Sequence, residues 1–165
     1  MDKRKLGFAV ALVVFALDQL SKWIVTGPLG IDQVPDQLVL LPIFNFTYTE
    51  NQGISLGLLN ASNPTGRWML VGLTAAIAIA VAFWIRREKN RTDQIALGMV
   101  LGGAVGNILD RVRFGYVIDF ADLHFGDIHP FLVFNVADAA ITIGVLLLVL
   151  RALLTRERKP PQKDE

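Results

Sequence analysis

The sequence predicts an all-α membrane protein in which four transmembrane helices carry a small extracytoplasmic β-sheet segment and a short interfacial segment. The 165 residues are 53% hydrophobic with a mean hydropathy of +0.46, which is too apolar for an ordinary soluble domain. Four apolar stretches are also long enough to cross the hydrocarbon core, which takes about 20 residues for roughly 30 Å. The length suits a single integral membrane domain covering residues 1–165.

Basic residues set the expected orientation of these spans. The spans are predicted at residues 6–25, 67–85, 94–113 and 134–154. Lys and Arg precede the first span, join the second to the third and follow the fourth, whereas the segment 27–66 has neither. By the positive-inside rule, we expect both termini and the 86–93 loop to face the cytoplasm. Segments 27–66 and 114–133 should then face outward.

The first span has two interpretations. Lys3, Arg4 and Lys5 followed by an apolar run are also typical of a cleaved signal peptide. The apolar run continues through "DQLSKWIV" at 18–25, and no convincing A-x-A cleavage site follows it. These features favour a retained membrane anchor.

The first outer segment has the pattern of a small sheet at about 38–60. Aromatic residues alternate there with polar ones, at Phe44, Phe46 and Tyr48. This is the period of a half-buried strand, and "GISLGLL" at 53–59 is a possible return strand. We expect the aromatic side to face lipid or substrate, although a loop that only shields the helices fits the pattern equally well. The second outer segment, 120–133, mixes apolar and polar residues and should lie in the membrane interface.

Polar side chains in the fourth span share one helix face. Asn135, Asp138 and Thr142 are spaced i, i+3 and i+7, so they stack above one another about a turn inside the start of the span. A lipid-facing carboxylate is costly, and we therefore expect this face to point into the bundle.

The third span carries a matching polar face. Gly103, Asn107 and Asp110 share it, and neighbouring glycines make the helix thin enough for a close approach. Asp110 can pair with Arg111 or Arg113 in a structural network, or it can take part in chemistry. The asparagines at 107 and 135 suit hydrogen bonds between helices.

The first span contributes Asp18 and Lys22, one helical turn apart. They can form a local ion pair whose lysine snorkels to the headgroups, or they can belong to a functional site. Both interpretations fit the spacing.

Two acids approach the outer membrane surface from adjacent elements. Asp119 follows the outward end of the third span, and Asp138 lies just below the same surface in the fourth. Two carboxylates that share a partly dry site do not both ionise easily, so one should hold a proton near neutral pH. This arrangement suits water activation as in aspartic proteases. A small proton-coupled transporter that uses the acids as a relay is the main alternative, and a non-catalytic scaffold is a weaker one.

Five short motifs, in order, give the chain a resemblance to a known family. They are "DQLSK" at 18–22, "NQG" at 51–53, "GNILDR" at 106–111, "GYVIDF" at 115–120 and "FNVAD" at 134–138. Each motif is weak alone. Together, on a four-span chain of this size, the sequence resembles the bacterial lipoprotein signal peptidases, also called signal peptidase II.

The resemblance implies a multi-pass aspartic endopeptidase of the bacterial inner membrane whose active site lies at the outer, periplasmic face. It implies cleavage of diacylglyceryl-modified prolipoproteins just before the lipidated cysteine, with Asp119 and Asp138 as the catalytic pair. By motif position, the supporting or substrate-orienting residues are Asn51, Gly53, Asn107, Arg111 and Asn135, together with Asp18 and Asp110. One departure concerns substrate contact, because Leu56 stands where the family commonly has Phe.

The resemblance also implies particular partners. Membrane lipid and the lipid-modified precursor are expected, and a globomycin-type cyclic peptide is a plausible inhibitor. No metal or organic cofactor is implied, in agreement with a chain that has no cysteine and no HExxH motif around His124 or His129. The net charge of +1 gives no reason to expect a nucleic-acid partner.

Overall fold

The computed structural model describes residues 3–54, 59–60, 64–126 and 128–156. Within these ranges, four helices are long and apolar enough to cross a membrane. They are α1 (Lys3–Thr26), α2 (Pro64–Arg87), α3 (Arg91–Arg113) and α4 (Val136–Arg156). Each overlaps a predicted span, which confirms the expected helical architecture.

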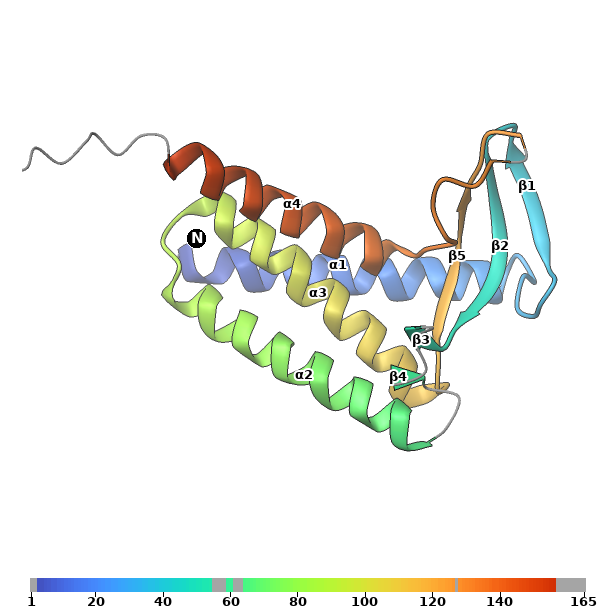
Figure 1. The fold of residues 1–165 in the computed structure, drawn as a ribbon, viewed down its shortest axis with the longest axis horizontal. Helices are drawn as coiled ribbons and strands as arrows, with labels where there is room; N and C mark the ends of the chain where they lie inside the picture. Colours follow the sequence, from blue (N-terminus) through green and yellow to red (C-terminus); the bar gives the residue numbers. More distant parts are fainter. Residues whose placement is uncertain (1–2, 55–58, 61–63, 127, 157–165) are drawn as a thin grey trace, which may run out of the picture.

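Helix α3 lies at the centre of the bundle and packs against α1, α2 and α4 (Figure 1). Its glycines allow this packing. Gly102 lies directly against the carbonyl oxygen of Ala11 in α1, and a Cβ on Gly103 would lie 2.5 Å from the carbonyl oxygen of Ala137 in α4. The predicted role of these glycines in close helix approach is therefore confirmed.

A three-stranded antiparallel sheet covers one end of the bundle, in the order β1 (Gln37–Leu41), β2 (Phe44–Asn51) and β5 (Val117–Leu123). Two short strands, β3 (Gly53–Ile54) and β4 (Leu59–Asn60), pair separately. The sequence predicts a strand through 44–48 correctly but not β5. The second outer segment therefore begins as a sheet strand, and the position of Leu56 lies outside the described residues.

The aromatic side of β2 packs into the protein. Tyr48 is buried with Val25 and Phe120, and Phe46 meets Phe120 edge-on with ring centroids 5.5 Å apart. The expectation that this side faces lipid or substrate is wrong, because β5 and the end of α1 supply a hydrophobic cluster that covers it. This packing fixes the sheet, and with it the strand that carries Asp119.

The end of the bundle away from the sheet is held by buried Gln94 at the start of α3. Its amide donates to the carbonyl oxygens of Ile85 and Glu88, and its side-chain oxygen accepts from the backbone N–H of Gly7. The α1 N-terminus and the α2–α3 connection lie together at this end (Figure 1). Helix α1 is therefore an integral part of the bundle.

Candidate active site

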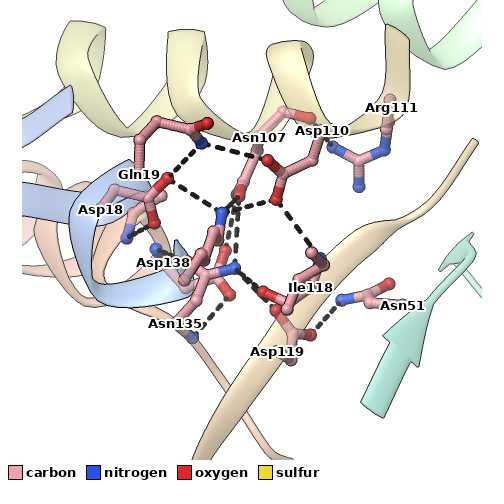
Figure 2. A network of polar contacts seen from close by, with 12 residues as sticks. Asp18, Gln19, Asn51, Asn107, Asp110, Arg111, Ile118, Asp119, Asn135 and Asp138 are labelled. Carbon is pink, nitrogen blue, oxygen red and sulfur yellow. Dashed lines mark hydrogen bonds and ion pairs between the residues drawn. The ribbon is translucent and has the colours of Figure 1, made fainter. Parts of the chain in front are cut away.

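The two acids singled out by the sequence converge where β5 meets the start of α4 (Figure 2). Asp119 pairs with Thr49 in the register between β5 and β2, and only 1% of its surface is exposed. Asp138 lies in the first turn of α4. The sheet and the bundle therefore each contribute one carboxyl group.

Asn135 caps α4 and positions Asp138. The Asn135 side-chain oxygen accepts the backbone N–H of Asp138 at 2.9 Å, while a carboxylate oxygen of Asp138 accepts the backbone N–H of Asn135 at 3.3 Å. This reciprocal pair is a capping box, which satisfies two free donors of the helix start. The helix therefore begins at Val136 rather than at residue 134, and Asp138 lies in its first turn instead of about a turn inside. The N-x-x-D spacing was a signal for this cap.

Two asparagines connect the carboxyl groups. The Asn135 amide donates to Asp119 at 2.6 Å, and the Asn107 amide donates to Asp138 at 2.8 Å. The Asn135 amide also lies 3.3 Å from the side-chain oxygen of Asn107. Asn135 thus contacts both acids. Its side-chain amide binds Asp119, whereas its side-chain oxygen and its backbone N–H bind Asp138.

Asn51 holds Asp119 from the opposite side. Its amide donates to the second carboxylate oxygen of Asp119 at 2.9 Å, and its side-chain oxygen accepts the backbone N–H of Gly53 at 2.9 Å. Gly53 has a φ of +101°, a conformation that L side chains rarely adopt. The glycine of the "NQG" motif therefore allows the turn that orients Asn51.

Lys22 lies inside the bundle, with 3% of its surface exposed. Its ammonium group pairs with Asp18 at 2.9 Å and with Asp110 at 2.6 Å. The snorkelling alternative is wrong. The expected pairing of Asp110 with Arg111 or Arg113 is also wrong, because the carboxylate of Asp110 faces α1 rather than its own helix neighbours.

The carboxylates of Asp18 and Asp110 each hold the backbone beside one candidate acid. Asp18 accepts the backbone N–H of Ala137 at 3.0 Å, and Asp110 accepts that of Ile118 at 3.3 Å. Lys22 forms ion pairs with both carboxylates. One cation therefore links the backbone at Ile118, just before Asp119, to the backbone at Ala137, just before Asp138. Sequence spacing does not reveal this role of Lys22, because Asp110 and Ala137 lie far from the first helix along the chain.

Arg111 is placed beside this network rather than in it. One of its terminal nitrogens donates weakly to the backbone oxygen of Asn107 at 3.4 Å. Its Nε is buried and has no hydrogen-bond partner within the described part of the chain. A guanidinium in this state is available to a ligand.

The environment of Asp119 favours its protonated form. Burial raises the pKa of Asp119 to about 7, and the nearby charge of Asp138 acts in the same direction. The hydrogen bonds from Asn51 and Asn135 and the charge of Lys22 oppose this rise. Asp119 can therefore hold a proton near neutral pH while it lies close to the charge of Asp138.

Two pockets open beside the pair. The pocket at Asp119, about 420 Å³, is lined by residues 49–53 and by Leu132 and Val133. The pocket at Asp138, about 280 Å³, is lined mainly by apolar groups, including Phe131, Leu132 and Ile143. Among the described residues, no group of three His, Asp or Glu side chains is arranged to hold a metal ion. The site instead places Asp119 at the pocket that is lined by residues 49–53 and Asp138 at the mainly apolar pocket.

A family model described as signal peptidase (SPase) II matches residues 10–154. The chain belongs to the signal peptidase II family. It is 57% identical to a lipoprotein signal peptidase of Sphingopyxis alaskensis, over 93% of this chain and 88% of that protein. Identity to a lipoprotein signal peptidase of Rhizorhabdus wittichii is 55%, over 98% and 93% of the two chains.

A solved structure described as a bacterial membrane enzyme has the same fold, with a TM-score of 0.78 and 29% identity. The match covers 96% of this chain and 93% of that one. The chain is therefore a peptidase, and its four membrane-capable helices give it the architecture of an inner-membrane, multi-pass protein. The transporter alternative finds no support.

Proposed function

We propose that Asp119 and Asp138 are the catalytic pair of an aspartic endopeptidase. In this proposal the enzyme removes the signal peptide of diacylglyceryl-modified prolipoproteins by cutting just before the lipidated cysteine. The observation that carries the proposal is the Asn135 side chain, which hydrogen-bonds to Asp119 at 2.6 Å and to the backbone of Asp138 at 2.9 Å. A fixed geometry for two acids is what paired-carboxyl catalysis requires.

The shared proton defines the reaction. One carboxylate takes a proton from water as the water oxygen attacks the scissile carbonyl carbon, while the carboxyl group that holds the shared proton gives it to the carbonyl oxygen. When the tetrahedral intermediate collapses, the carbon–nitrogen bond breaks and a proton passes to the leaving nitrogen. The products are a signal peptide with a new carboxyl end and a lipidated cysteine with a free amino group.

The remaining polar residues support this pair. Asn51, Asn107 and Asn135 orient the two carboxyl groups directly. Further positioning comes from Gly53, through the turn that it permits, and from Asp18 and Asp110, through the backbone. Arg111, whose buried Nε has no hydrogen-bond partner among the described residues, orients the substrate.

The proposed orientation places the catalytic pair at the outer face of the bacterial inner membrane. Arg86 and Arg87 end α2 at the opposite end of the bundle from the sheet, and Arg151 pairs with Asp93 at that end. The positive-inside rule then assigns both termini to the cytoplasm. Lipid attached to the substrate cysteine keeps the scissile bond at the depth of the pair. A globomycin-type cyclic peptide would compete with substrate there.

Purified protein and a diacylglyceryl-modified precursor test the proposal directly. The wild type should yield a shortened lipoprotein, whereas Asp119→Asn and Asp138→Asn should each yield no detectable product while unfolding at the wild-type temperature. Asp122→Asn is a matched control, because Asp122 is a buried acid on the same strand that contacts Thr47 and His129 instead of the pair. Normal cleavage by folded Asp138→Asn would overturn the assignment.

A further inference from the structure

An irregularity in the sheet decides which residue lies beside Asp119. Strand β2 runs next to β5 (Figure 1) and pairs with it so that Phe46 lies opposite Ala121 and Thr49 lies opposite Asp119. These pairs are three steps apart on β2 but two steps apart on β5, so β2 contains one extra residue, a β-bulge. In a regular pairing, Tyr48 would lie opposite Asp119. The bulge places Thr49 there instead.

The exchange of Tyr48 for Thr49 keeps the space beside Asp119 open and polar. Tyr48 is buried in the hydrophobic cluster with Val25. Thr49 is half-buried and lines the pocket of about 420 Å³ that also includes Asp119. Residues directly opposite each other in an antiparallel pair share a face of the sheet, with Cβ atoms about 4.5 to 5.5 Å apart. Thr49 therefore places a hydroxyl group within reach of a ligand group that meets the carboxyl group of Asp119.

No described residue forms a hydrogen bond with the hydroxyl group of Thr49. Two positions earlier on the same strand, the hydroxyl group of Thr47 accepts the Gln37 amide at 2.9 Å and donates to Asp122 at 3.2 Å. The two carboxylate oxygens of Asp119 accept their hydrogen bonds from asparagine amides and not from Thr49. The donor of Thr49 is thus available to a group that is bound in the pocket.

The carbonyl oxygen of the scissile peptide is a group that needs such a donor. It gains negative charge when water attacks the carbonyl carbon, and hydrogen-bond donors fixed around it lower the energy of this transition state. Burial raises the pKa of Asp119 to about 7, so this acid can hold the proton that the oxygen receives. The carbonyl oxygen should therefore lie beside Asp119, where Thr49 is the residue opposite.

We propose that Thr49 is a further catalytic residue, whose hydroxyl group donates a hydrogen bond to the scissile carbonyl oxygen as negative charge develops on that oxygen. The inference rests on the proposed function and adds a second donor beside the acid. The hydrogen stays on Thr49 throughout, so no covalent bond to this residue forms or breaks. Because the contact strengthens with the developing charge, it accelerates the chemical step more than it tightens substrate binding.

Replacement of Thr49 by Val and by Ser tests the proposal. Val keeps the β-branched shape that suits a strand but lacks the hydroxyl group, whereas Ser keeps it. With a lipidated precursor and enzyme in excess, the rate constant of the first turnover should fall at least about tenfold for Thr49→Val, while the dissociation constant of the precursor stays unchanged. Thr49→Ser should restore most of the rate. Thr47→Val is the matched control and should cleave at the wild-type rate, because the Thr47 hydroxyl group is bonded within the sheet.

The pH profile separates this role from an effect on the acid. Thr49→Val should keep the alkaline limb of the wild type, since the hydroxyl group does not bond to Asp119, and a shifted limb would overturn the proposal. A wild-type rate for Thr49→Val, a Thr49→Ser variant that is equally slow, or a weaker dissociation constant with an unchanged rate would each overturn it as well. If the wild type did not cleave the precursor at all, the proposed function itself would fail.

Discussion

Replacing Asn51 by Ala should change the pH dependence of cleavage. Asn51 donates to a carboxylate oxygen of Asp119 at 2.9 Å, and this hydrogen bond holds the pKa of Asp119 below the value that burial and Asp138 would otherwise impose. The proposed reaction requires the shared proton, which is lost as pH rises through the pKa of Asp119 at about 7. Because the hydrogen bond from Asn51 lowers the pKa of Asp119, its removal raises that pKa.

The size of the shift follows from the bond that is lost. A hydrogen bond to a charged group contributes about 1.5 to 3 kcal/mol, and one pKa unit corresponds to about 1.4 kcal/mol. Water from the adjoining pocket replaces part of the lost interaction. We therefore expect the alkaline limb of the kcat/KM profile to move upward by about one pH unit, while the maximal rate falls because Asp119 is less well oriented.

Initial rates on a lipidated precursor, measured from acid to alkaline pH in one detergent, give this profile. Gln52→Ala is the control, because Gln52 lines the same pocket without a hydrogen bond to Asp119 among those described. An Asn51→Ala profile whose alkaline limb coincides with that of the wild type, or moves downward, would refute the reasoning. A uniform loss of rate without any shift would assign Asn51 to orientation alone.

Three further outcomes are expected. Lys22→Met should lower the free energy of unfolding by about 3 to 5 kcal/mol, because it leaves two buried carboxylates without their cation; an unchanged unfolding temperature would contradict this. Gly103→Ala should lower both stability and kcat, since its Cβ would lie 2.5 Å from the Ala137 carbonyl oxygen. Gly72→Ala should lower neither, because a Cβ there would meet no described atom within 4 Å apart from its chain neighbours and its own helix backbone. Asp138→Asn should still bind a globomycin-type peptide in a calorimetric titration while losing cleavage, and loss of binding would show that the carboxylate also holds the inhibitor.

Local patterns account for the elements that sequence reasoning predicted. A continuous apolar run predicts a transmembrane helix. Alternation of apolar and polar residues, as at Phe44, Phe46 and Tyr48, predicts a half-buried strand. The N-x-x-D spacing at Asn135 and Asp138 is also typical of a capped helix start, and it marks the beginning of α4. Strand β5 was missed because all but the last of its residues are buried, which removes the alternation that marks a strand.

The sequence by itself determined which segments are long and apolar enough to cross a membrane, and its motifs predicted which two acids form the catalytic pair. Each of these depends on residues that are close along the chain. The tertiary structure alone decided which partner each charge has, because Asp18 meets Ala137 across 119 positions and Gln19 meets Asp110 across 91. In a low-dielectric interior every buried charge must be paired by whichever group the fold brings near it, and that choice is made by helix packing rather than by neighbours in sequence.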